Sequence, residues 1–127
     1  ALQNKTKQAE EYYFKTIKIN PDHKLSYYRL GRLYYKLGEL TKSKEFLNKS
    51  ITLALKSYNT AMDFKSIISS YQLMGIIYLK EKNLKRSIFC FNQAIKFSIG
   101  YDFDKYLYIS INETKELLDS INKSYLN

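Results

Sequence analysis

One pattern of four residues occurs twice in this chain of 127 residues and restricts its fold more than any other feature. An aromatic residue, an apolar residue, a glycine and a second aromatic residue follow one another with spacings of three, one and three. The two sets are Tyr27, Leu30, Gly31 and Tyr34, then Tyr71, Met74, Gly75 and Tyr78. Spacings of three and four place residues on one face of an α-helix. A glycine on that face lets a second helix approach closely while the rings fill the space beside it.

Each set is followed, at the same distance, by a pattern that has a small residue at each end. The two patterns are Ser43, Leu47 and Ser50, then Ser87, Phe91 and Ala94. Small side chains opposite a glycine allow two antiparallel helices to pack closely. The sequence therefore predicts two helix pairs that repeat the same contact.

The apolar spacing is helical along almost the whole chain, which predicts an all-α fold. Four glycines and one proline are too few for the turns of a sheet protein. Asp22, Thr41 and Asp102 are expected to cap helices at their N-termini, and Gly38 and Gly100 are each expected to end one. The expected helices cover residues 2–19, 24–37, 41–57, 60–82, 84–99 and 102–125.

The stretch from Ile19 to Gly38 resembles a tetratricopeptide repeat, a helix–turn–helix module of about 34 residues. The resemblance covers about residues 8–99. Gly31 and Gly75 are 44 residues apart, so the chain is similar to the long-repeat variants of that family. The resemblance implies a right-handed solenoid of antiparallel helix pairs, about six helices in all, with a capping helix at the C-terminus.

We expect residues 1–127 to form a single domain of this kind. Its parts would be a half repeat, two repeats and a capping helix, over residues 1–21, 22–58, 59–100 and 101–127. The first residue is Ala1 and not Met, so the chain is expected to follow a removed leader or to be a fragment of a longer protein. The compartment would be cytoplasmic, or extracytoplasmic if a signal sequence has been removed. The open face of the first helix would allow a homodimer.

The formal net charge is +9, from 21 Lys and Arg against 12 Asp and Glu. A basic protein can bind nucleic acid or an anionic surface. However, Lys, Asn, Ile and Tyr all have A/T-rich codons and together supply 53 residues, so a low-GC genome accounts for the lysines without any functional demand. Nucleic acid is therefore a less favoured partner than protein. No run of apolar residues is long enough to span a membrane.

The sequence offers no chemistry that would suggest an enzyme. His23 and Cys90 are the only residues of their types, so neither a nucleophile with its base nor a metal site can be assembled around them. We predict no catalytic residue, no metal and no cofactor. Cys90 lies between Phe89 and Phe91, where a small buried side chain is expected.

The resemblance also implies where a partner would bind. In this family the first helix of each pair lines the concave surface, and residues one position past the packing residues face into it. This predicts a groove that carries no acid and is rich in Tyr and Arg, which are common at protein interfaces. The groove residues are Tyr28, Arg29, Arg32, Tyr35, Lys36, Gln72, Ile76, Leu79 and Lys80.

The predicted function is a non-catalytic adaptor or scaffold that binds a peptide segment or a helix of another protein, one with acidic and apolar side chains. Two alternatives stay open. One is a basic binder of nucleic acid or an anionic surface, and the other is a peptide-sensing regulator of the long-repeat bacterial type.

Overall fold

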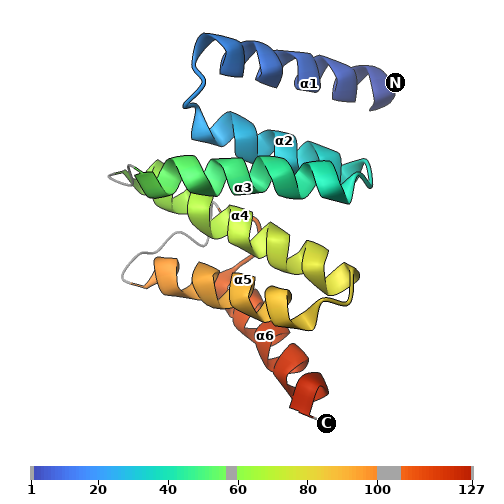
Figure 1. Cartoon of the computed structure of the whole chain (residues 1–127), viewed down its shortest axis with the longest axis vertical. Coiled ribbons are helices and arrows are strands. Elements are labelled where there is room, and N and C mark those ends of the chain that lie inside the picture. The colour runs from blue at the N-terminus through green and yellow to red at the C-terminus, as the bar shows by residue number, and fades with distance from the viewer. Residues whose placement is uncertain (1, 57–59, 100–106, 127) are drawn as a thin grey trace.

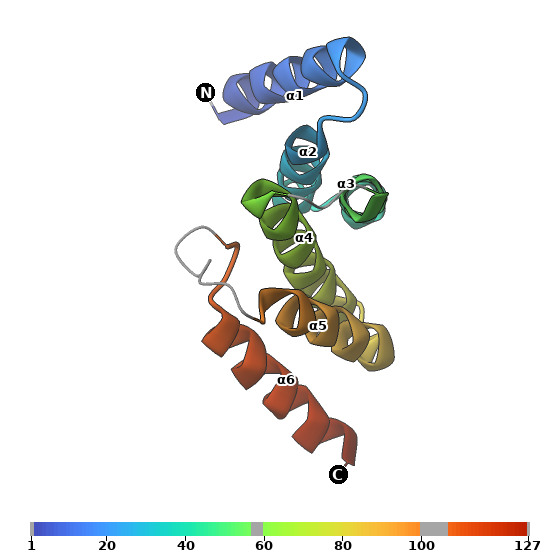
Figure 2. The same cartoon turned by 90° about the vertical axis from the view of Figure 1, so that its left-hand side faces the viewer.

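The computed structural model describes residues 2–56, 60–99 and 107–126, and within them the chain is all helix and connecting turns (Figure 1). The described residues form six helices, α1 (Leu2–Ile19), α2 (Lys24–Lys36), α3 (Leu40–Lys56), α4 (Ala61–Lys80), α5 (Leu84–Ser98) and α6 (Ile111–Leu126). Helices α2 and α3 form one packed pair, and α4 and α5 form a second pair beside it. Turned by 90°, the chain is an open stack with α1 at one end and α6 at the other (Figure 2). The all-α solenoid of helix pairs predicted from the sequence is confirmed.

The helices of each pair meet at the repeated glycine. The Ser43 hydroxyl donates a hydrogen bond to the Gly31 carbonyl oxygen at 2.6 Å, and the Ser87 hydroxyl donates to the Gly75 carbonyl oxygen at 2.8 Å. All four residues are buried. The small serines therefore do more than leave room, because they also bond the backbone of the opposite helix.

Two helix starts differ from the prediction. The residue that caps α2 is His23 and not Asp22, since the helix begins at Lys24 and the His23 ring accepts from the backbone N–H three residues later. The third helix begins at Leu40, so Thr41 lies inside it. Gly38 follows α2 with a φ of +78°, a left-handed conformation that favours glycine at the end of a helix.

The last helix is shorter than predicted, because it begins at Ile111 and not near residue 102. Asp102 and Gly100, the predicted cap and helix end, lie outside the described residues. Ser110 takes the capping role, since its hydroxyl accepts from the Glu113 backbone N–H at 3.0 Å. Residues 107–110, which we name the C-terminal strap, are not helical.

Buried tyrosines make this fold sensitive to alkaline pH. Burial, together with the nearby Glu10 carboxylate, raises the pKa of Tyr34 to about 12, and burial is the larger cause. The unfolded chain loses such a proton near about pH 10, so the stabilisation is complete below that pH and falls as the pH rises toward about 12. We expect the free energy of unfolding, measured by urea denaturation, to decrease less steeply between about pH 10 and about pH 12 in Tyr34→Phe than in the wild type. The exposed Tyr12 supplies the control Tyr12→Phe, and equal slopes in both variants would contradict the assignment.

Candidate functional site

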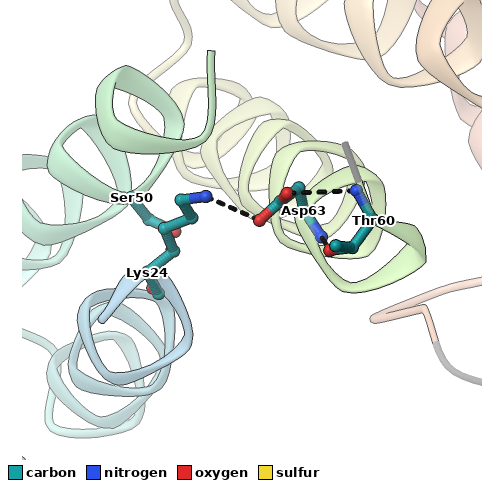
Figure 3. A network of polar contacts seen from close by, with 4 residues as sticks. All are labelled: Lys24, Ser50, Thr60 and Asp63. Atoms are coloured by element: carbon teal, nitrogen blue, oxygen red, sulfur yellow. Dashed lines mark hydrogen bonds and ion pairs between the residues drawn. The ribbon is translucent and has the colours of Figure 1, made fainter. Parts of the chain in front are cut away.

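A largely buried ion pair joins α2 to α4, the two helices predicted to line the groove (Figure 3). Lys24 Nζ lies 2.7 Å from Asp63 Oδ1. Asp63 also forms a capping box with Thr60, because its second carboxylate oxygen accepts from the Thr60 backbone N–H and its own N–H donates to the Thr60 hydroxyl, each at 3.2 Å. From α3, the Ser50 hydroxyl donates to the Lys24 carbonyl oxygen at 3.0 Å. One carboxylate therefore both starts α4 and positions it against α2.

The C-terminal strap lies along α4 and covers the middle of its groove face. The Gln72 side-chain amide nitrogen donates to the Ile109 carbonyl oxygen at 2.9 Å, and the Ile109 backbone N–H donates to the Gln72 side-chain oxygen at 3.3 Å. The Tyr108 backbone N–H donates to the Ser69 hydroxyl at 3.3 Å. Gln72, predicted to face a partner, is therefore completely buried, because the strap uses both ends of its amide.

A pocket of about 300 Å³, the strap pocket, opens beside these bonds between α2 and the first turns of α4. Arg32 lines this pocket, and its guanidinium carbon lies 5.8 Å from the Tyr28 ring centroid and 5.7 Å from the Tyr108 ring centroid. The buried Ser66 hydroxyl, which also lines it, has no hydrogen-bond partner among the described residues. The lining combines three cations with apolar side chains and contains no carboxylate from the described residues: Leu25, Tyr28, Arg29, Arg32, Met62, Lys65, Ser66, Ser69, Leu107 and Tyr108.

A second pocket of about 240 Å³, the α1–α2 pocket, adjoins the first. Arg29 and Arg32 line both pockets, and Lys36 lines the second. Ala9 and Tyr13 of α1 form its apolar side together with Leu33. The two arginines therefore lie between the two pockets and give both of them a positive charge.

Only some of the predicted groove residues lie together in the structure. Arg29, Arg32 and Lys36 line the pockets described above. Tyr28 lines the strap pocket but is only 7% exposed, because it packs in the hydrophobic core. Tyr35 and Lys80 contact each other, with Lys80 Nζ 4.9 Å from the Tyr35 ring centroid.

The remaining predicted groove residues, Ile76 and Leu79, are half-buried on α4 and line neither pocket. Several lining residues were not predicted. Met62, Lys65 and Ser69 precede Gln72 at helical spacing, so extending the predicted face toward the start of α4 would have found them. Tyr108 carried no such signal, because its position depends on the chain folding back.

Two further features of the described residues concern membranes and metal ions. No described helix has the length and apolar content needed to cross a membrane. No group of three or more His, Cys, Asp or Glu side chains in the described part of the chain is arranged to hold a metal ion.

Comparisons with known proteins agree with the helix-pair architecture. A family model for the tetratricopeptide repeat matches residues 25–62 and 68–98, more than half of the chain. The chain is 35% identical over 72 residues to the TPR repeat-containing protein MJ1428 of Methanocaldococcus jannaschii, a match that covers 54% of this chain and 13% of that protein. It is 26% identical over 130 residues to the anaphase-promoting complex subunit CDC16 of Saccharomyces cerevisiae, over 95% of this chain and 14% of that protein. The chain thus spans only a small part of either relative, and it belongs to the tetratricopeptide repeat family.

Proposed function

We propose that this chain is a non-catalytic protein-interaction module, an adaptor or scaffold segment, that binds an acidic and apolar segment of a partner protein. The observation that carries the proposal is the pair of adjoining basic pockets that share Arg29 and Arg32. Membership of the tetratricopeptide repeat family supports it, since these repeats generally mediate contacts between proteins. One relative is named as a subunit of a complex, which agrees with a role in assembly.

The pockets and the arginines between them would bind different groups of the partner. An apolar side chain of the partner would enter the strap pocket against Leu25, Met62 and Leu107. A partner carboxylate would then meet Arg29, which is exposed at the rim. Arg32 is already held over two tyrosine rings, so ordering it for a second carboxylate costs little side-chain entropy. A volume of about 300 Å³ is at the small end for ligand pockets, which favours one or two side chains over a whole metabolite.

The test is a charge reversal at the shared arginines. We expect Arg29→Glu with Arg32→Glu to weaken the partner by at least about 30-fold, roughly 2 kcal/mol, because each reversal places a like charge against the acidic segment. The partner is first isolated by affinity capture and mass spectrometry, and its affinity is then measured by calorimetry with purified proteins. Circular dichroism checks that the variant keeps its fold.

A matched control makes the same change in net charge elsewhere. Lys49 of α3 and Lys85 of α5 are exposed and line neither basic pocket. The pair Lys49→Glu and Lys85→Glu should change the affinity by no more than about twofold, since exposed charges outside an interface contribute little. Equal losses in the two double variants, with capture that is sensitive to nuclease and falls steeply with salt, would replace the proposal by the basic-surface alternative.

A further inference from the structure

The first helix pair contains a stack of aromatic rings on the side of α2 that faces α3. The Phe46 ring lies between Tyr27 and Tyr34 and is stacked on both, with centroid distances of 6.4 Å and 5.4 Å. Phe14 of α1 meets Phe46 edge-on at 5.8 Å. In this pair the chain itself fills the space between its two tyrosines.

The second helix pair keeps the two tyrosines but lacks both phenyl rings. The 44-residue step that relates Tyr34 to Tyr78 relates Phe46 to Cys90. The 34-residue step that relates Tyr13 of α1 to Leu47 of α3 likewise relates Phe14 to Asn48. A pocket of about 190 Å³, the Tyr71–Tyr78 pocket, remains there, and Cys90 and Asn48 both line it.

The size and lining of this pocket fit one aromatic ring. An apolar cavity of about 150 Å³ in a protein is large enough to bind benzene. Beside the two tyrosines, the lining includes Met74 and Phe89. Phe89 and Phe97 contact Tyr71, with ring centroids 6.4 Å and 6.3 Å away, yet the pocket between the tyrosines stays open.

The charges at the rim also differ between the two helix pairs. In the first pair, Tyr34 lies near the Glu10 carboxylate, and Lys42 Nζ is 5.3 Å from the centroid of the Tyr34 ring. In the second pair, Tyr78 has two cations over its ring, with Lys44 Nζ at 4.9 Å and the Arg86 guanidinium carbon at 5.7 Å.

Lys44 also forms an ion pair with Glu81 at 2.7 Å. Two cations against that one carboxylate leave the rim positive. Such a rim suits a ligand with an acidic group next to its ring.

We propose that the Tyr71–Tyr78 pocket is a docking site for an aromatic side chain of a partner protein, one that has an acidic residue beside it. The first helix pair shows which group fits this geometry, because there Phe46 occupies the equivalent position. Tyr71, Met74 and Tyr78 lie on the opposite face of α4 from Met62, Ser66 and Ser69 of the strap pocket, as their helical spacing requires. The site is therefore separate from the two basic pockets, and its failure would leave the proposed function intact.

The two methionines of the chain provide the measurement, because Met74 lines the Tyr71–Tyr78 pocket and Met62 lines the strap pocket. The protein is labelled with ¹³C at the methionine methyl groups and titrated with the peptide acetyl-Asp-Phe-amide. We expect a saturable ring-current shift of the Met74 methyl signal and no shift of the Met62 signal. An excess of acetyl-Asp-Leu-amide should not displace acetyl-Asp-Phe-amide. The peptide acetyl-Lys-Phe-amide should bind more weakly than acetyl-Asp-Phe-amide.

Variants that supply the missing ring test the same site from within the chain. Cys90→Phe restores the arrangement of the first helix pair, so it should raise the melting temperature and abolish the Met74 shift. Asn48→Phe places a ring at the position equivalent to Phe14 and should also abolish the Met74 shift. This second variant tests the proposal if Cys90→Phe does not fold. Cys90→Ala leaves the pocket open and should keep the shift.

Four results would overturn the proposal. They are a Met74 signal that the Phe peptide does not move, equal shifts of both methionines, a shift that persists in a folded Phe variant, and equal binding of the Asp and Lys peptides. A Met74 shift that depends on protein concentration without any peptide would assign the pocket to a second copy of this chain and would also overturn the partner assignment.

Discussion

Replacement of Gly31 or Gly75 by leucine is expected to destabilise the protein severely, by about 3 kcal/mol or more. A Cβ atom on Gly31 would lie 2.5 Å from Leu47 Cδ2, and one on Gly75 would lie 2.6 Å from Phe91 Cε1. Leu47 and Phe91 are completely buried, so a shift of either side chain disturbs the core packed around it. The helices must separate, which also weakens the serine hydrogen bonds to the two glycine carbonyls.

Thermal denaturation followed by circular dichroism checks this prediction. A loss of about 3 kcal/mol corresponds to a melting temperature roughly 10 °C lower in a domain of this size. Gly38→Leu is the matched control, since nothing lies within 4 Å of a Cβ atom there and only its positive φ opposes the change. That variant should lose about 1–2 kcal/mol. Melting temperatures equal to wild type for Gly31→Leu and Gly75→Leu would contradict the close approach of the helices.

The second large effect is expected at Asp63, where Asp63→Ala should lower the free energy of unfolding by about 3 kcal/mol. The change removes the ion pair to Lys24 and the capping-box hydrogen bond from the Thr60 backbone N–H to the carboxylate, whereas the bond from the backbone N–H of residue 63 to the Thr60 hydroxyl can remain. The carboxylate is largely buried, so water replaces these bonds poorly. Asp63→Asn keeps a side-chain oxygen for the cap but loses the charge, and its loss should be intermediate.

Urea denaturation of a double-mutant cycle with Lys24→Met separates the ion pair from the cap. A coupling energy of about 1 kcal/mol or more is expected for this pair, against about 0.5 kcal/mol or less for the exposed pair Glu39 and Lys42. If the two coupling energies are equal, the Lys24–Asp63 pair does not fix α4 against α2. Because α2 and α4 form two walls of the strap pocket, Asp63→Ala should also weaken the partner.

The sequence determined the helices and their pairing because both depend on local spacing. Residues three and four apart share a helix face whatever the rest of the chain does, and the repetition of Gly31 at Gly75 showed which faces must meet. The close contacts at Leu47 and Phe91 follow from the same spacing. The resemblance to the tetratricopeptide repeat implied that Arg29, Arg32 and Lys36 face the groove, and these three residues line the basic pockets.

Only the tertiary structure decided which parts of that face are open. The same resemblance implied that Gln72 faces the groove, but Gln72 is buried because Ile109, 37 residues later, pairs with its amide. Likewise, Cys90 stands at the repeat position that Phe46 occupies in the first helix pair, so the sequence shows that the second pair lacks this ring. The volume of the pocket that remains depends on how closely α3, α4 and α5 pack. Periodicity reports which side chains share a face of one helix, but a contact between distant segments depends on where the whole backbone places them.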